Sequence, residues 1–329
     1  MGSSHDYDVV VINDFIVDLI VELSEFPKPE KTLISLRVER NVGGNGNFSI
    51  MASRLGLKVK AIGCVGNDSN GFFLKNTLSR EGVDTRDIVI KSGTTKMCLA
   101  LVCRGSKSFI GLFNEKTVFL RPEDIGEEMF NSRALYFSGY SLAEEISISE
   151  RDAVFKAFNI CMRRGLEIFF DASPLINKVP REILNPILMA SKILFFNVDE
   201  LVKLTKEASI NASVERLRSI TKAIIVVKLG EKGALVYHND KFINVDAIEV
   251  SPVDTTGAGD AFNAAFIYCY MNGFTLEKAL LFANAVGALT VKKFGAGTNL
   301  PNIMEIKAFI EAKGLSKLLN ELLSCAQGG

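Results

Sequence analysis

The chain has 329 residues, of which 48% are hydrophobic and 23% charged, so it can bury a globular core and is neither disordered nor collagen-like. Its 38 basic side chains balance its 38 acidic ones, which predicts small-molecule partners and no nucleic acid. The apolar runs are shorter than the roughly 18 residues of a membrane-spanning helix, so we expect no membrane partner. No secretory leader is evident and the six cysteines form no CxxC pair, so we expect a cytoplasmic protein.

Short β-branched runs alternate with longer helical patterns along the chain. We expect strands at residues 8–12, 59–64, 134–137, 167–170, 192–196 and 223–227. We expect helices at residues 45–54, 71–81, 150–164, 198–205, 213–220, 258–271, 275–292 and 303–323. Alternation of this kind builds βαβ units, so the predicted fold is α/β, with a doubly wound and mostly parallel sheet flanked by helices.

Two stretches, 16–40 and 94–113, interrupt this alternation. In the second, MCLALV and SFIGLF predict antiparallel strands around a polar turn. We expect the two stretches to form a small β-sheet lid inserted in a single domain that spans residues 1–329; an ordinary edge hairpin is the alternative. Such lids commonly cover ligands at the carboxyl edge of a parallel sheet, and exposed apolar lid edges predict a homodimer.

The strongest chemical signal is DTTGAGD at residues 254–260, which precedes an apolar helical pattern. Gly257, Ala258 and Gly259 carry little or no side chain, so a phosphate can reach the backbone N–H groups where the helix begins. Asp260 stands in the first turn, where its carboxylate can accept the proton of a hydroxyl that attacks phosphorus. The alternative is a glycine-rich turn with Asp260 as a helix cap.

Other catalytic and phosphate motifs are absent from the sequence. There is no GxxxxGK[ST], and Asn13 and Asp14 follow the first strand in place of GxGxxG, which disfavours a P-loop enzyme or a dinucleotide oxidoreductase. Two histidines, His5 and His238, give almost no material for a zinc site or a Ser/His/Asp triad. Catalysis therefore depends on carboxylates, backbone amides, lysine or arginine.

DTTGAGDAF resembles the second signature of the ribokinase-like family of carbohydrate kinases, also called the phosphofructokinase-B family. The similarity to the family continues in GG and Asn47 before RLG, in GCVGNDSNG at 63–71, NVDE at 197–200, VVKLGEKG at 226–233 and FANAVGAL at 282–289. The spacing from Gly44 to Asn47 is one residue shorter than in the family's first signature. The resemblance covers nearly the whole chain and implies a doubly wound α/β domain with a small β lid.

The resemblance also implies a reaction, the ATP-dependent transfer of the γ-phosphoryl group to a hydroxyl of a small carbohydrate. Asp260 would be the catalytic base, and the amides of Gly257, Ala258 and Gly259 would stabilise charge on the transferring group. The residues that would contact the sugar are Asp18, Gly43, Gly44 and Asn47.

For the nucleotide and metal ions, the resemblance implies a second set of residues. Those near ATP would be Asn197, Lys228, Gly230, Gly233, Asn284 and Gly297. Many relatives have threonine where Lys228 stands, and the lysine could bring positive charge to the polyphosphate. Glu200 would organise Mg²⁺ through water, although Asn197 and Glu200 fit a capped helix start equally well. Asp254 and Thr256 resemble the monovalent-cation site of ribokinases, so activation by K⁺ is a hypothesis.

The substrate stays open between a sugar and a nucleoside. DASPLIN at 171–177 lacks the arginine of the DxNxR motif, which disfavours the fructokinase and ketodeoxygluconate kinase subgroups. The lid candidates are apolar and suit a sugar or a nucleoside base alike: Leu33, Ile34, Met97, Leu99 and Phe113. A non-catalytic sugar- or nucleotide-binding sensor is the non-enzyme alternative, which the retained base and glycines disfavour.

Overall fold

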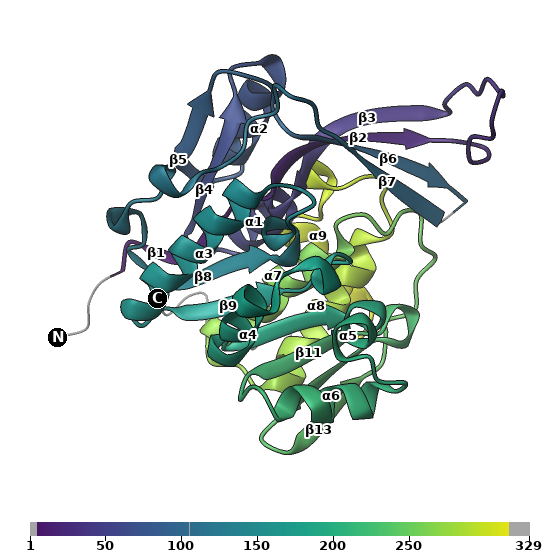
Figure 1. Cartoon of the computed structure of the whole chain (residues 1–329). Helices are drawn as coiled ribbons and strands as arrows, with labels where there is room; N and C mark the ends of the chain where they lie inside the picture. The colour runs from purple at the N-terminus through teal and green to yellow at the C-terminus, as the bar shows by residue number, and fades with distance from the viewer. Residues whose placement is uncertain (1–4, 105, 316–329) are drawn as a thin grey trace.

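The computed structural model describes residues 5–104 and 106–315, and two β-sheets organise this part of the chain (Figure 1). The large sheet has the strand order β13-β12-β11-β10-β9-β8-β1-β4-β5. Its parallel strands are β1 (Tyr7–Ile12), β4 (Val59–Gly66), β5 (Asp84–Lys91), β8 (Ser132–Ser138), β9 (Glu167–Asp171), β10 (Ile193–Asn197) and β11 (Ile224–Lys228). At one edge, β12 (Ala234–His238) and β13 (Lys241–Val245) continue the sheet in antiparallel pairing.

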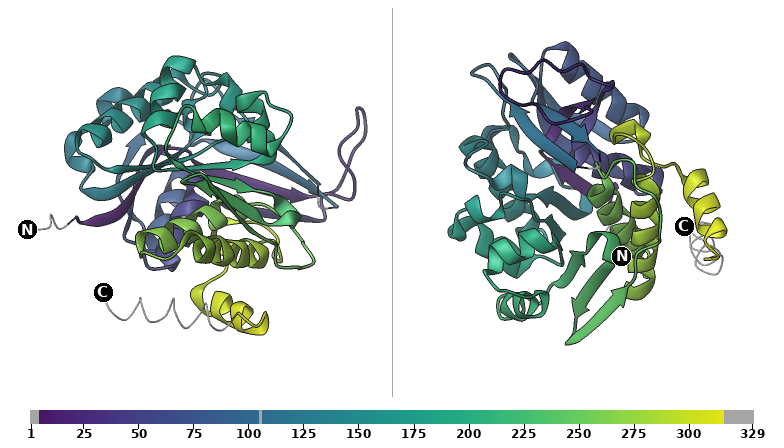
Figure 2. Two further views of the ribbon diagram at one scale, coloured as in Figure 1. Left: turned by 90° about the horizontal axis from the view of Figure 1, so that it is seen from below. Right: turned by 90° about the vertical axis from the view of Figure 1, so that its right-hand side faces the viewer.

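Helices cover both faces of the large sheet, and alternate strand residues therefore enter two separate cores (Figure 2). In β1, Val9 and Val11 belong to one core and Val10 and Ile12 to the other. The first core is closed by α1 (Asn45–Arg54), α2 (Ser69–Arg80), α7 (Ala258–Met271), α8 (Leu276–Thr290) and α9 (Ile303–Ala312). The second is closed by α3 (Ile148–Arg163), α4 (Arg181–Ala190), α5 (Val198–Thr205) and α6 (Ile210–Arg218).

The predicted doubly wound α/β fold is confirmed, and the predicted strands and helices are present with ends that differ by a few residues. The last predicted helix, 303–323, is seen as α9, but it ends at Ala312, where Lys313 is the C-cap and Gly314 has φ 73°; residues 316–323 lie outside the described residues. The sequence analysis missed α4, β5 and the β12–β13 hairpin. Pro186 lies inside α4 and obscures its helical pattern, while β5 is a partly exposed edge strand with four charged residues in DTRDIVIK.

The small sheet has the order β3-β2-β6-β7 and rises beside the end of β1 (Figure 1). Its strands are β2 (Phe15–Glu22), β3 (Arg37–Gly44), β6 (Met97–Cys103) and β7 (Ser106–Leu112). The predicted antiparallel pairing of MCLALV with SFIGLF is confirmed, and β2 pairs in parallel with β6. Ile20, Ala100 and Val102 pack on Phe294, which joins the inner face of this sheet to the loop after α8. The small sheet is the predicted lid, and it extends beyond 16–40 at both ends.

In residues 5–104 and 106–315, no helix combines the length and the apolar character that crossing a membrane requires.

Candidate active site

The parallel strands end along one edge of the large sheet and bring polar side chains from distant segments together there. Asp14 follows β1, Asp171 ends β9, Asn197 ends β10 and Lys228 ends β11. The lid strand β2 begins directly after Asp14, so the lid adjoins this edge of the large sheet. Ligands of open α/β sheets bind at this edge.

The glycine-rich segment forms a cradle at the start of α7. Gly257 is the N-cap residue with φ 73°, and no side chain caps the helix. The N–H of Ala258 donates to the carbonyl oxygen of Thr255 at 3.3 Å, and no side chain occupies the helix start, where the helix dipole favours an anion. A Cβ at position 257 would lie 2.8 Å from the Cβ of Ala296, so the close packing requires glycine. The alternative of a turn capped by Asp260 does not occur.

Asp260 lies in the first turn of α7, next to the cradle. Its Oδ2 accepts a hydrogen bond of 3.2 Å from Nδ2 of Asn47, and Oδ1 of Asn47 accepts one of 2.8 Å from the N–H of Gly297. Burial raises the pKa of Asp260 to about 7; the negative charge of Asp171 adds to this, while Lys228 opposes it. Asp260 therefore exchanges a proton near neutral pH, as a general base must.

Asp18 on β2 lies against Gly43 on β3, and the lid strands thus carry the predicted substrate residues. A Cβ at Gly43 would lie 2.1 Å from Oδ2 of Asp18, so only glycine leaves room for this carboxylate. Burial raises the pKa of Asp18 to about 7, with further contributions from the charges of Asp14 and Asp260. No hydrogen-bond donor to its carboxylate is found among the described residues, so its oxygens are available to hydroxyl groups.

Asp14 is a site residue that sequence reasoning missed. Asn13 and Asp14 both have φ 56°, a left-handed conformation that is uncommon outside glycine, and Oγ of Ser138 donates to Oδ2 of Asp14 at 3.0 Å. A Cβ at Gly44 would lie 2.1 Å from the carbonyl oxygen of Asp14, which explains that glycine. Burial raises the pKa of Asp14 to about 6. Its position directly after the first strand was the available signal.

A buried ion pair behind Asp14 was also missed. Nζ of Lys96 donates to Oε1 of Glu150 at 2.7 Å and to Oδ1 of Asn13 at 3.2 Å. The two charged side chains are 4% and 2% exposed, so they neutralise each other in the interior. Nothing in the sequence indicated that these residues, 54 positions apart, would meet.

Three residues predicted to lie near the nucleotide and Mg²⁺ make hydrogen bonds within the chain: Asn197, Glu200 and Asn284. Asn197 and Glu200 form a reciprocal capping box at the start of α5, with both bonds at 2.8 Å, and burial raises the pKa of Glu200. Both amide hydrogens of Asn284 bind backbone, at 3.1 Å to the carbonyl of Val245 and 3.2 Å to that of Asp246, which fastens α8 to the end of β13.

The remaining nucleotide-side residues lie in two turns. Gly230 and Gly233 form the turn from β11 to β12, where a Cβ at Gly233 would lie 2.1 Å from the carbonyl oxygen of Val245. Gly297 has φ 59°, and a Cβ there would lie 2.1 Å from Oδ1 of Asn41 on the lid strand β3. Nζ of Lys228 donates to Oδ1 of Asp171 at 2.9 Å.

Asp254 connects the two loops that flank the cradle. Its Oδ1 accepts from the N–H of Thr256 at 2.9 Å and from Oγ1 of Thr256 at 2.7 Å, and its Oδ2 accepts from the N–H of Gly295 at 2.9 Å. The described residues contain no group of three or more His, Cys, Asp or Glu that could hold a metal ion. A divalent ion at these strand ends would thus take its other ligands from phosphate and water, the arrangement that Mg²⁺ favours.

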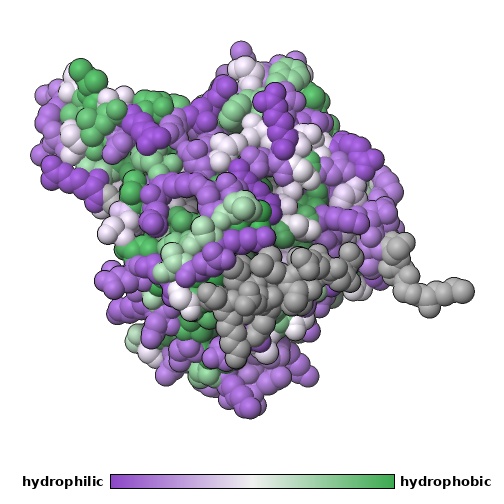
Figure 3. Space-filling view, turned by 180° about the vertical axis from the view of Figure 1, so that it is seen from behind, coloured by the Kyte–Doolittle hydropathy of each residue, from purple (hydrophilic) through white to green (hydrophobic). Residues whose placement is uncertain are grey.

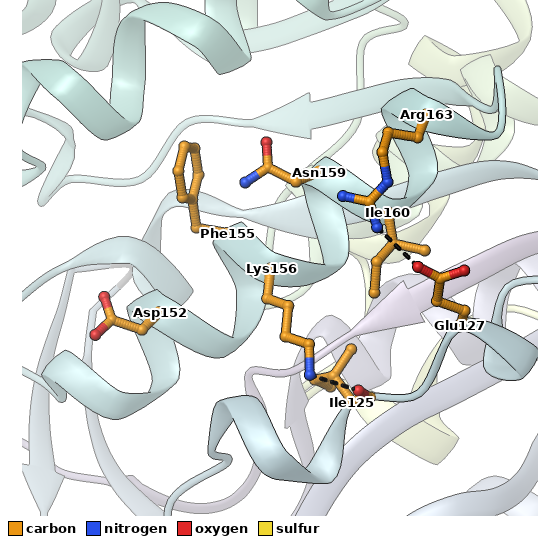
Figure 4. A pocket seen from close by; sticks show the side chains of 8 residues that line it. All are labelled: Ile125, Glu127, Asp152, Phe155, Lys156, Asn159, Ile160 and Arg163. Carbon is orange, nitrogen blue, oxygen red and sulfur yellow. Dashed lines mark hydrogen bonds and ion pairs between the residues drawn. The ribbon is translucent and has the colours of Figure 1, made fainter.

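A separate hollow of 570 Å³ lies along α3, away from these strand ends (Figure 4). Its cations are already engaged: Nζ of Lys156 donates to the carbonyl of Ile125 at 2.9 Å, and Arg163 binds Glu127 at 2.8 Å. The glycine-rich segment, Asp260 and the predicted substrate residues all lie outside this hollow, so the strand ends are the candidate active site.

Comparison with known proteins identifies the family of the chain. The family model described as pfkB family carbohydrate kinase matches residues 6–303, and the chain belongs to that family. It is 27% identical over 311 residues to a nucleoside kinase of Methanothermobacter thermautotrophicus, covering 93% of this chain and 96% of that protein. It is 29% identical over 318 residues to a fructokinase of Vibrio alginolyticus, covering 92% and 98%.

Solved structures show the same relationship. A crystal structure of an E. coli protein described as ribokinase II superposes with a TM-score of 0.81 at 28% identity, covering 93% of this chain and 99% of that one. The same description is given for a complex with ATP and Mg²⁺, which has a TM-score of 0.79. The family consists of kinases such as ribokinase and fructokinase, so the chain is a phosphotransferase that uses an alcohol group as acceptor.

Proposed function

We propose that the chain is an ATP-dependent kinase that transfers the γ-phosphoryl group to a hydroxyl of a small, uncharged sugar. The observation that carries the proposal is the adjacency of Asp260, a carboxylate with a pKa of about 7, and the uncapped first turn of α7. A base for the attacking hydroxyl and donors for the phosphoryl oxygens are thereby held side by side.

The residues of the chain divide the work of the transfer. Asp18 binds acceptor hydroxyls over Gly43, and Asp260 removes the proton from the hydroxyl that attacks phosphorus. The N–H of Gly297 fixes the side-chain amide of Asn47, and this amide holds the Asp260 carboxylate in place. The amides of Gly257, Ala258 and Gly259 bind the oxygens of the transferring group.

The donor in this proposal is ATP with Mg²⁺. The open amides of the cradle fit a polyphosphate, and the E. coli neighbour was solved with ATP and Mg²⁺. Bound Mg²⁺ would neutralise phosphate charge. Glu200, together with Asn197, would hold the water ligands of Mg²⁺. The residues that would line the nucleotide phosphates are Lys228, Gly230 and Gly233. Asp254 and Thr256 would set the loop of a K⁺ site; rates unchanged when K⁺ is replaced by a bulky organic cation would refute that part.

An uncharged acceptor follows from the charges around Asp18. Asp14, Asp18 and Asp260 interact electrostatically with one another, and each has a raised pKa. Lys96 is neutralised by Glu150, which leaves Lys107 on β7 as the cation that interacts with both Asp18 and Asp260, one lysine against three carboxylates. An acceptor with a carboxylate or phosphate group would meet net repulsion here, whereas hydroxyl groups can donate to these carboxylates.

A nucleoside is the second candidate acceptor, because Tyr140 offers an aromatic side chain at the same site. Tyr140 is partly exposed and interacts electrostatically with Asp14, Glu200 and Asp260. An aromatic ring there can stack on a base while the carboxylates bind the ribose. The nucleoside kinase among the relatives supports keeping this alternative.

The test is an ADP-release assay with ATP, Mg²⁺ and K⁺. Ribose, fructose, inositol, adenosine and cytidine are compared with ketodeoxygluconate and sugar phosphates. We expect turnover with a neutral acceptor, and Asp260→Asn to lower kcat by about 10²- to 10⁴-fold. The matched control, Glu182→Gln, changes an exposed carboxylate in the first turn of α4 and should retain full activity. Turnover restricted to anionic acceptors refutes the uncharged acceptor, and normal turnover by Asp260→Asn refutes the base and favours a binding protein.

The lid supports a homodimer. Large apolar side chains are exposed on it, including Ile34 (87%), Leu36 (66%) and Val38 (52%), and Figure 3 shows hydrophobic atoms gathered on the projecting part of the molecule. Ile110 on β7 is also exposed, so Ile110→Asp should convert a dimer to a monomer in light scattering. A monomeric mass for the unmodified protein would refute pairing through the lid.

A further inference from the structure

A buried lysine stands where two strand ends meet the cradle. Lys228 ends β11 and Asp171 ends β9, with β10 between them, so the lysine side chain crosses the end of β10 to reach the carboxylate at 2.9 Å. Nζ of Lys228 also donates to Oδ1 of Asn263 at 3.3 Å, and Nδ2 of Asn263 donates to the hydroxyl of Tyr136 at 3.2 Å. The ammonium is held from two sides by groups that are themselves fixed.

The ammonium is also next to the cradle. A Cβ built at Gly259 would lie 3.6 Å from Nζ of Lys228, with ordinary van der Waals contact. The side chains of Lys228 and Asp171 are 17% and 12% exposed, so solvent screens their charges only partly. Burial alone would lower the pKa of Lys228, but the charges of Asp171 and Glu200 raise it above its ordinary value. The lysine is therefore a fixed cation at neutral pH.

We propose that Asp171 is a positioning residue: it holds the Lys228 ammonium against the Gly257–Gly259 cradle, where the cation supports negative charge on the transferring phosphoryl group. This inference rests on the proposed kinase function. Lysine is suited to the task because its compact charge interacts with a phosphate oxygen from one position, and Asp171 prevents the long side chain from leaving the cradle.

The pair also acts on the base. Several charged or titratable groups face Asp260: Asp171, Lys228, Asp14, Asp18, Lys107, Tyr136 and Tyr140. Within this set Asp171 raises the pKa of Asp260 and Lys228 lowers it. Removing one partner leaves the other uncompensated, so the two single substitutions must shift the titration of the base in opposite directions.

The experiment measures kcat/KM for the acceptor from pH 5.5 to 9 at saturating MgATP. Asp171→Asn keeps the shape and an oxygen acceptor but removes the charge, and we expect the acid limb of the profile to move about one unit lower. Lys228→Met should move it about one unit higher, and Lys228→Arg, which keeps the charge, should move it little. Lys91→Met is the matched control, because Lys91 forms a partly buried ion pair with Asp124 elsewhere and should leave the limb unchanged.

Positioning is tested by Asp171→Ala, which also removes the hydrogen bond. We expect kcat at the pH optimum to fall at least tenfold below that of Asp171→Asn; equal rates in the two variants would overturn the positioning role. Limb shifts of the same sign, or none, would overturn the electrostatic role. Thermal unfolding checks each variant, and Lys228→Thr serves in place of Lys228→Met if the latter does not fold. An inactive unmodified protein would refute the proposed function instead, which keeps the two failures distinct.

Discussion

Gly43→Ala should separate acceptor binding from nucleotide binding. The added Cβ would lie 2.1 Å from Oδ2, 2.2 Å from Cγ and 2.4 Å from Oδ1 of Asp18, where an ordinary contact begins at 3.4 Å. A shift of about 1 Å is therefore unavoidable. Asp18 is only 6% exposed and belongs to the middle of β2, so its carboxylate can move only by rotating away from the acceptor.

The cost follows from the hydrogen bonds that the carboxylate would lose. A hydrogen bond to a charged group contributes about 1.5–3 kcal/mol, and losing about 2–3 kcal/mol corresponds to a decrease of about 30- to 150-fold in kcat/KM for the acceptor. The KM for MgATP should change less than about threefold, because Gly43 is on the lid and the cradle is on α7. Initial rates measured against each substrate in turn check both numbers.

Two comparisons make the result interpretable. Gly287→Ala on α8 has its nearest neighbours at 3.8 Å or more, so it should leave kinetics unchanged and stabilise the helix by about 0.5–1 kcal/mol. Asp18→Asn removes the charge without crowding and should lower acceptor kcat/KM to a similar extent. If Gly43→Ala remains folded and its acceptor kcat/KM stays within threefold of the unmodified protein, the assignment of Asp18 is wrong.

Three further predictions concern the base and the buried charges. With a pKa of about 7, Asp260 is ionised to about 9% at pH 6 and about 91% at pH 8, so kcat/KM should rise about tenfold across this interval, and a flat profile contradicts its role. Asn47→Ala should lower kcat about tenfold without weakening MgATP binding measured by calorimetry, because it releases the Asp260 carboxylate; an unchanged kcat contradicts this. Glu150→Gln should cost about 3–5 kcal/mol in the free energy of unfolding, because it leaves the Lys96 ammonium buried without its partner. Although burial opposes it, the charge of Glu150 raises the pKa of Lys96 above 10.5, so the stabilisation by this ion pair is complete below about pH 10.5 and is lost as the pH rises through the higher folded-state pKa. Equal denaturation midpoints for the unmodified protein and Glu150→Gln would contradict this prediction.

The main elements could be predicted because their burial leaves a direct record in the sequence. All eight residues of β4 are buried, and all of them except Lys60, which pairs with Asp87, are small or apolar, as a strand covered on both faces requires. The edge elements leave a weaker record. In β13 no residue is fully buried, and in β5 only Thr85 and Ile88 are, so the pairing partner rather than local composition determines these strands.

The candidate site also has a part that the sequence predicts and a part that it does not. The local motif DTTGAGD identified the cradle and Asp260, because both belong to one helix start. The GG motif identified Gly43 and Gly44, where a Cβ would collide with Asp18 and Asp14. Asp171 and Lys228 could not be paired in advance. Their contact depends on two strands separated by a third, and on a side chain long enough to cross it.

The arrangement of charge gives the candidate site two unlike ends. At the acceptor end, Asp14, Asp18 and Asp260 outnumber nearby unpaired cations, and Lys96 is already neutralised by Glu150. At the other end the open amides of α7 and the Lys228 ammonium favour anions. Electrostatics alone would therefore favour the binding of a polyphosphate at one end and of a polyol at the other, with Asp260 between them. In the proposed reaction, the cation held by Asp171 and the start of α7 would offset the charge of Asp260 at the point of transfer, so that this carboxylate could serve as base without repelling the phosphoryl group.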